Sequence, residues 1–115
     1  MRESGKDAKV YLDDIRRAIA KIKSFTGKMD EAAFSRNEMA FDATVRNLEI
    51  IGEAVAKLPS PFREKHRKIE WRKIVGMRNR LIHGYDEVDR RIVWNVVKND
   101  IPKLEAELKK IKEKK

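Results

Sequence analysis

Residues 71–85 read WRKIVGMRNRLIHGY and predict an amphipathic helix. At about 100° per residue around a helix axis, the apolar side chains of this stretch gather on one side. They are Trp71, Ile74, Val75, Leu81, Ile82 and Tyr85. Arg78 lies near the middle of the same arc. Because arginine keeps its charge and an unpaired charge in an apolar site is costly, we expect Arg78 to reach a carboxylate, a phosphate or a cleft.

Two long helices are predicted before this one. The first covers residues 7–25, with apolar residues spaced by three or four positions and Gly27 as a stop signal. The second is introduced by Ser35–Glu38, whose serine and glutamate match a capping box, and it ends at Pro59. A short helical turn is expected at 30–34. The apolar positions of the two helices are Leu12, Ile15, Ile19, Ile22, Phe41, Val45, Leu48, Val55 and Leu58.

Proline, glycine and capping residues on either side of residues 71–85, the motif helix, predict where the neighbouring helices begin and end. Ser60 and Pro61 suit the N-cap and first residue of a short helix that precedes Trp71. The motif helix itself is predicted over 70–83, with Gly84 as a left-handed C-terminal cap. A last helix begins after Asp89 as its N-cap. Its apolar positions are Ile92, Val93, Val96, Val97, Ile101, Leu104, Leu108 and Ile111.

Pro102 lies inside the apolar pattern of this last helix. Because proline removes one backbone hydrogen bond and clashes with the preceding turn, we expect a kink near Asn99. No segment shows strand alternation or an internal repeat. The sequence therefore predicts an all-α protein, an antiparallel bundle of four main helices plus one or two short ones. It is expected to form a single domain over 1–115, with flexible ends at 1–6 and 112–115.

The composition of the chain limits the kinds of domain and functional site that it can form. The chain has 115 residues, 41% of them hydrophobic, which suits one domain with a core of modest size. Cysteine is absent and there are two histidines, so neither disulfides nor a thiolate zinc site is available, and we expect no metal and no cofactor. No apolar run is long enough for a membrane span, and Met1–Lys9 is unlike a secretory signal. The expected location is cytoplasmic.

The positive charge is concentrated near the motif. The formal net charge is +9, and residues 63–80 hold eight basic against two acidic side chains, a local charge of +6. The basic residues are Arg63, Lys65, Arg67, Lys68, Arg72, Lys73, Arg78 and Arg80. Such a surface attracts nucleic acid and makes binding salt dependent. A solvated helix face together with a lysine-rich tail would give the same charge count.

Arg78 and His83 suit RNA cleavage without a metal ion. That reaction needs a base for the ribose 2′-OH, an acid for the leaving oxygen and a cation for the phosphate. Histidine titrates near neutral pH, and arginine binds phosphate oxygens through two parallel hydrogen bonds. One chain, however, supplies one motif histidine for two proton transfers, and the two side chains lie roughly 140° apart on an ideal helix. A turn at Gly84, or pairing of two chains about a two-fold axis, would bring these groups together.

The spacing of Arg78, His83 and Tyr85 resembles the signature of the HEPN superfamily, specifically its HepT-like branch of toxin ribonucleases. Residues 45–54, 71–85 and 92–102 carry the resemblance further. It implies a homodimer whose motifs meet in a composite ribonuclease site. It also implies a partner, an MNT-type nucleotidyltransferase antitoxin, which silences the toxin by attaching AMP to the tyrosine at the position of Tyr85.

The expected roles follow from the motif and its resemblance. Arg78 and His83 are the catalytic candidates and Tyr85 is the AMP acceptor. Asn79, Arg46 and Glu49 are supporting candidates, and Arg72, Lys73 and Arg80 are candidate RNA contacts. Two further expectations concern single residues. Arg78 alone would also fit a buried salt bridge to Glu49 or Glu53, and His66 is expected at the surface or as an RNA contact.

Three other functions fit the same residues. A catalytically silent HEPN module could bind RNA or nucleotide in the same cleft. A structural interaction protein could use the basic surface to dock an acidic partner. A protein whose main role is to receive a nucleotidyl group would also carry Tyr85. RNA cleavage by the isolated chain separates the first from a ribonuclease, and identification of the partner separates the other two.

Overall fold

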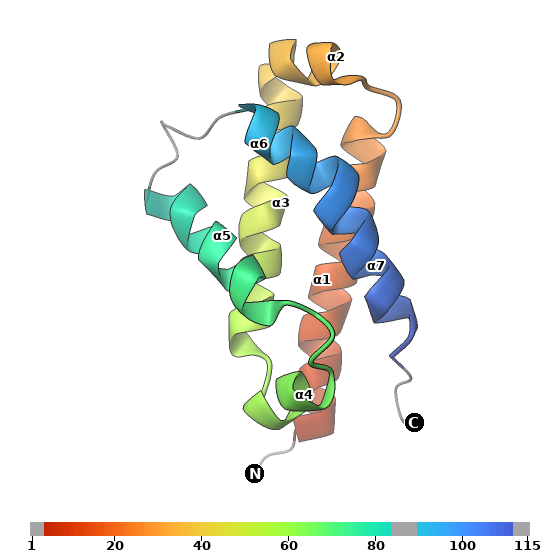
Figure 1. Ribbon diagram of the computed structural model, residues 1–115, viewed down its shortest axis with the longest axis vertical. Coiled ribbons are helices and arrows are strands. Elements are labelled where there is room, and N and C mark those ends of the chain that lie inside the picture. Colours follow the sequence, from red (N-terminus) through yellow and green to blue (C-terminus); the bar gives the residue numbers. More distant parts are fainter. Residues whose placement is uncertain (1–3, 84–89, 112–115) are drawn as a thin grey trace.

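The computed structural model describes residues 4–83 and 90–111, and within these ranges every regular element is helical (Figure 1). The elements are α1 (Ser4–Thr26), α2 (Glu31–Arg36), α3 (Glu38–Lys57), α4 (Ser60–Lys65), α5 (Trp71–His83), α6 (Arg90–Asn95), the π-helical η2 (Val96–Asp100) and α7 (Ile101–Lys109). The last three follow one another without a break. The described residues therefore contain four long helical segments and two short helices, which confirms the all-α prediction. None of the described helices is long and apolar enough to cross a membrane.

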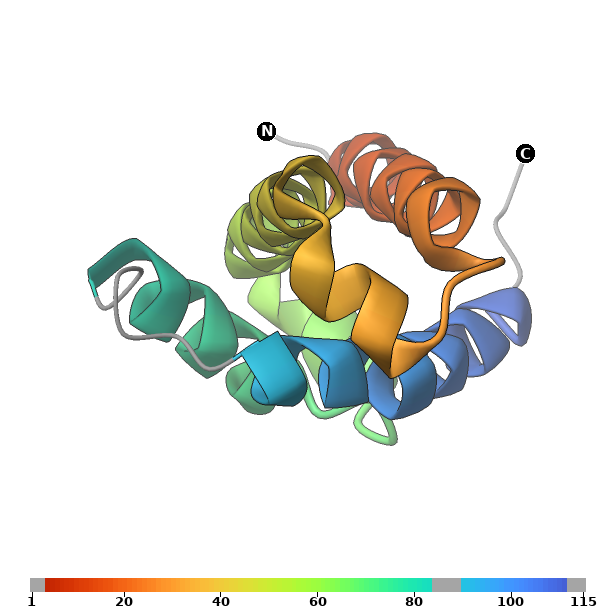
Figure 2. The same ribbon diagram turned by 90° about the horizontal axis from the view of Figure 1, so that it is seen from above.

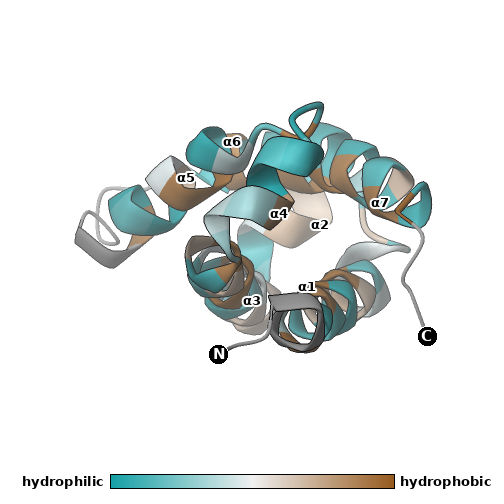
Figure 3. Cartoon of the chain, turned by 90° about the horizontal axis from the view of Figure 1, so that it is seen from below, coloured by the Kyte–Doolittle hydropathy of each residue, from teal (hydrophilic) through white to brown (hydrophobic). Residues whose placement is uncertain are grey.

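The helices form two layers. α1 and α3 run side by side in opposite directions, and α5 and the α6–α7 segment lie across them (Figures 1 and 2). Each long helix carries both hydrophobic and hydrophilic residues, as the apolar spacing predicts (Figure 3). All nine apolar positions predicted for the first two helices are buried, with Ile15, Ile22 and Leu48 fully enclosed. Burial of side chains of this size contributes about 1.5–3 kcal/mol each.

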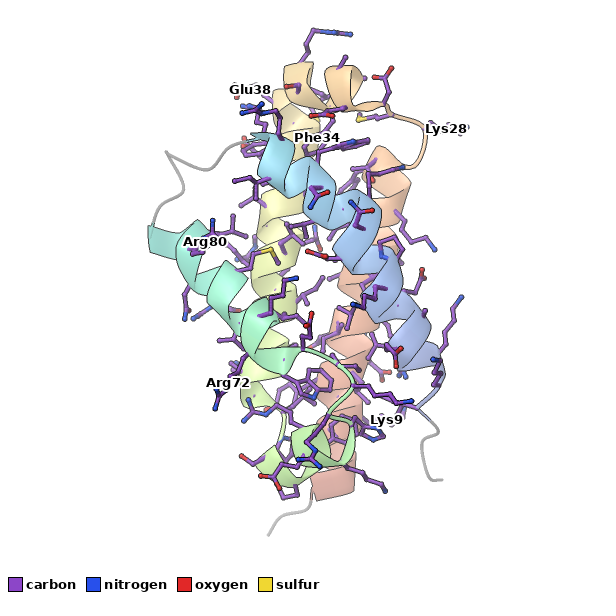
Figure 4. All side chains as sticks on the ribbon, in the orientation of Figure 1. Lys9, Lys28, Phe34, Glu38, Arg72 and Arg80 are labelled. Atoms are coloured by element: carbon purple, nitrogen blue, oxygen red, sulfur yellow. The ribbon has the colours of Figure 1, made fainter. Side chains whose placement is uncertain are left out.

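The short helix α2 inserts one aromatic side chain into the core. Phe34 is fully buried, and its ring centroid lies 5.1 Å from that of Trp94 in α6 and 6.0 Å from that of Phe41 in α3. Figure 4 shows this side chain between its own helix and α6. The helical turn expected at 30–34 is thus confirmed as Glu31–Arg36, and it joins the two layers at one end of the molecule.

The capping box predicted at Ser35–Glu38 is wrong. Ser35 lies inside α2, and the two helices are capped by Asp30 and Asn37. Each of these side chains accepts a hydrogen bond from the backbone N–H three residues later, at 2.8 and 2.9 Å. Glu38 instead reaches Arg90 of α6, with 3.3 Å between its carboxylate oxygen and the guanidinium. The loop between the helices is so short that Asn37 ends one helix and starts the next.

The start of α4 differs by one residue from the prediction. Ser60 is the first helical residue, so the N-cap is Pro59 and Pro61 is the second helical residue. Proline is tolerated there because the first backbone N–H groups of a helix have no partner within it. The caps predicted at Gly84 and Asp89 lie outside the described residues.

The last helical segment departs from an ideal α-helix just before Pro102. Residues Val96–Asp100 form a π-helical turn, and α7 begins directly after them. The kink predicted near Asn99 stays a prediction. The predicted apolar stripe holds except at Ile92, which is 50% exposed. Ile92 lies near the start of α6 and lines the groove between α5 and the α6–α7 segment, so it does not reach the core.

Candidate functional site

The motif helix α5 is anchored at its first residue. Trp71 is buried, and its indole N–H lies 3.1 Å from the backbone oxygens of both Arg63 and His66. Phe62 of α4 packs against the same indole, with ring centroids 6.3 Å apart. Trp71 and Trp94 are both buried in the core. With its N-terminal end fixed to the α4 segment, α5 crosses α3 (Figure 1).

α5 lies close against α3 where Arg78 crosses Gly52. A methyl group built at Gly52 would overlap the Arg78 Cβ and lie 2.6 Å from its Cγ. Real Cβ atoms do not approach other atoms this closely, so the contact needs glycine at this position. The aliphatic part of the arginine side chain therefore rests directly on the backbone of α3. Gly52 is not among the site residues predicted from the sequence, although a glycine inside a helical pattern can mark a packing requirement.

The Arg78 guanidinium lies at the edge of the α3–α5 contact. Its Nη2 is 3.7 Å from the Glu53 carboxylate, and its Nη1 donates a hydrogen bond to the Asn79 side-chain oxygen at 2.9 Å. Its Nε is buried and has no hydrogen-bond partner among the described residues. The side chain is 30% exposed. Of the two carboxylates considered as partners for Arg78, Glu53 forms the ion pair. The guanidinium still reaches solvent, where an anion can approach it.

Two of the supporting candidates, Arg46 and Glu49, lie on α3 and pair with each other, whereas Glu53 pairs with Arg78. Arg46 and Glu49 form an ion pair within their own helix, with 3.8 Å between Nη1 and Oε1. This is the ordinary spacing of neighbours three residues apart on a helix. Asn79 contacts Arg78, as its hydrogen bond shows. The supporting roles predicted for Arg46, Glu49 and Asn79 stay predictions.

The remaining motif residues lie at the edge of the described chain. His83 is the last residue of α5, and its side chain is outside the described residues. Tyr85 lies within 84–89, which are also outside them. The catalytic role predicted for His83 and the acceptor role predicted for Tyr85 therefore stay predictions.

Besides its contact with α3, α5 borders a groove of about 830 Å³ that lies between α5 and the α6–α7 segment. Its floor includes Leu48 and Ile51 of α3, and its rim includes Lys73 and Arg80. Arg72 projects from α5 away from α7 (Figure 4). The three candidate RNA contacts, predicted as parts of one basic surface, are thus divided between two faces of the helix.

His66 lies in the basic segment that precedes α5. Its ring packs against Phe62, with centroids 4.6 Å apart. Partial burial lowers the pKa of His66 below its ordinary value, and the neighbouring Lys65 charge lowers it further. The imidazole is therefore more often neutral near pH 7 than an exposed histidine would be. Within residues 4–83 and 90–111, no group of three or more His, Asp or Glu side chains is placed to hold a metal ion.

Comparisons with known proteins identify relatives along most of the chain. A family model described as "Ribonuclease HepT-like" matches residues 15–111. "Probable ribonuclease HepT" of Thermococcus cleftensis is 41% identical over 112 residues, which cover 97% of this chain and 99% of that protein. "Putative RNase TTE0752" of Caldanaerobacter subterraneus is 49% identical over 81 residues, 70% of this chain and 72% of the relative.

Another relative is much longer than this chain. "Gamma-glutamylcyclotransferase and putative RNase MJ0434" of Methanocaldococcus jannaschii is 44% identical over 108 residues. These residues cover 94% of this chain, and the chain spans 49% of that protein. No solved structure matches the chain.

Proposed function

The chain belongs to the HepT-like ribonuclease family, and we propose that it is an endoribonuclease that cleaves RNA without a metal ion. The observation that carries the proposal is the placement of Arg78. Its side chain rests on α3 at Gly52 and pairs with Glu53, while its guanidinium remains partly exposed, and residues 63–80 around it have a local charge of +6. This arrangement suits a cation that binds a phosphate on the protein surface.

The proposed reaction uses the ribose of the RNA as the nucleophile. A base removes the proton of the 2′-OH, and the 2′ oxygen attacks the adjacent phosphorus. The bond from phosphorus to the 5′ oxygen of the next nucleotide breaks, and an acid gives that oxygen a proton. Arg78 stabilises the negative charge that builds up on the phosphate oxygens, and His83 serves as base or acid. The products are a 2′,3′-cyclic phosphate and a free 5′-OH.

The proposed site is composite, formed by two copies of the chain. One chain has a single motif histidine, and the reaction moves two protons. In a homodimer with two-fold symmetry, two copies of Arg78 and His83 line one cleft, so one histidine acts as base and the other as acid. Asn79 is proposed to assist, because its side chain already contacts the Arg78 guanidinium.

The proposed biological role is that of a toxin in a toxin–antitoxin pair. The partner is an MNT-type nucleotidyltransferase that transfers AMP to Tyr85. This modification would place bulk and a negative phosphodiester two residues after His83, where the phosphate would compete with RNA for Arg78. The net charge of +9 supports RNA as the opposing polyanion.

The first prediction tests the reaction itself. The purified chain, free of its partner, is expected to cleave mixed RNA in excess chelator, and mass spectrometry of the fragments is expected to find 2′,3′-cyclic phosphate ends. Loss of cleavage in chelator with rescue by magnesium would contradict the mechanism. RNA binding without cleavage would favour a catalytically silent module of the same family.

The second prediction concerns the acceptor residue. Tyr85→Phe should remain an active nuclease and escape silencing by the partner transferase, because the acceptor oxygen is lost and the ring is kept. The readout is the mass shift of the motif peptide after incubation with ATP and the transferase, together with residual cleavage. Tyr11→Phe is the matched control, since Tyr11 is the other tyrosine of the chain and lies on α1. Modification of Tyr85→Phe would place the acceptor elsewhere.

A further inference from the structure

The crossing of α5 over α3 depends on one residue without a side chain. Gly52 lies under Arg78, and a Cβ there would overlap the arginine Cβ and lie 2.6 Å from its Cγ. We propose that Gly52 and Glu53 are positioning residues, which set where the Arg78 guanidinium meets an RNA phosphate. This inference rests on the function proposed above.

The glycine fixes the first part of the arginine side chain. Arginine has many rotatable bonds, and ordering it costs conformational entropy. Contact of its Cβ and Cγ with the α3 backbone restricts the torsions nearest the main chain before any RNA arrives. A side chain at position 52 would push α5 away from α3 and carry the guanidinium outward with it. Displacement by about 1 Å at a reacting centre can lower a rate on the order of 10²-fold.

Glu53 acts on the far end of the same side chain. Its carboxylate lies 3.7 Å from Arg78 Nη2, beyond hydrogen-bonding distance, and it is 45% exposed. It therefore attracts the guanidinium toward α3 without capping its donors. A carboxylate in this position also repels an RNA phosphate. We expect Glu53 to lower RNA affinity somewhat while it raises the rate of the bound complex, an effect that a purely structural residue would not produce.

The decisive comparison is between two glycines. Gly52→Ala should lower the cleavage rate at saturating RNA on the order of 10²-fold. Gly76→Ala, on α5, should leave the rate unchanged, since no described atom lies within 4 Å of a Cβ built there. Both substitutions gain the same helix propensity, so they differ in the space around the new methyl group. A Gly52→Ala chain that is as active as Gly76→Ala would overturn the positioning role.

A second comparison separates positioning from folding. Glu53→Gln should lower the rate at saturating RNA about tenfold and leave RNA affinity equal or higher. Glu105→Gln is the matched control, because Glu105 forms an ion pair between helices with Lys23 at 3.0 Å, far along the chain from Arg78. Weaker RNA binding with an unchanged rate for Glu53→Gln would contradict the inference.

A double substitution keeps the test valid if Gly52→Ala folds poorly. Arg78→Gly removes the atoms that a Cβ at position 52 would overlap. Gly52→Ala should therefore lower the thermal midpoint far less in the Arg78→Gly background than in the wild type, and additive effects would contradict the contact. A wild-type chain that cleaves no RNA would overturn the proposed function. An active wild type with equal rates for the two glycine variants would overturn the positioning role alone.

Discussion

Replacement of Arg78 by alanine is expected to lower RNA cleavage by about 10²–10⁴-fold, roughly 3–5 kcal/mol of activation barrier, and His83→Ala should have an effect of the same order. The arginine stabilises charge that develops on the phosphate, and the histidine transfers a proton. The measurement is the single-turnover rate on a defined RNA, with circular dichroism of each variant to check the helical content.

The stability of Arg78→Ala separates the catalytic role from the structural alternative. The Arg78–Glu53 pair has 3.7 Å between its charged atoms, and both side chains are partly exposed, 30% and 45%. Pairs of this kind contribute about 0–1 kcal/mol. Thermal unfolding should therefore change little. Arg17→Ala is the matched control, because Arg17 pairs with Asp14 on the solvent-facing side of α1. Full activity of Arg78→Ala, or unfolding of the variant, would contradict the catalytic role.

The helices could be predicted because their apolar spacing is strong. Ile15, Ile22 and Leu48 lie at core positions of regular stripes, and the structure buries all three. The caps were harder, because serine, aspartate and asparagine all satisfy the N-terminal N–H groups of a helix. Ser35 matched a capping pattern, and the loop geometry gave the role to Asn37 instead. Such choices depend on where neighbouring helices end, which local sequence does not specify.

The candidate site was predictable in its residue types and less so in its contacts. The position of Arg78 among apolar residues predicted a partner for its charge, and Glu53 is that partner. Gly52 could not be connected to Arg78 from the sequence, because the two residues lie on different helices and meet through the crossing of α3 and α5. The basic residues of α5 also divide between two faces, since Lys73 and Arg80 line the groove and Arg72 does not.

The second large effect is expected from combining two inactive chains. In a composite cleft, a chain with Arg78→Ala still supplies His83, and a chain with His83→Ala still supplies Arg78. A heterodimer of the two therefore contains one complete arginine–histidine pair contributed by different protomers. Its activity should exceed that of either parent on the order of tenfold or more, because a single intact acid or base restores much of the lost rate.

The experiment uses two differently tagged chains, co-expressed and purified in tandem so that only mixed dimers remain. The wild-type pair and the two variant homodimers, prepared with the same tags, are the controls. We expect RNA cleavage by the mixed dimer in excess chelator, well above that of both variant homodimers. A mixed dimer that forms and is as inactive as its parents, or a chain that stays monomeric at working concentration, would contradict a site shared between two copies of Arg78 and His83.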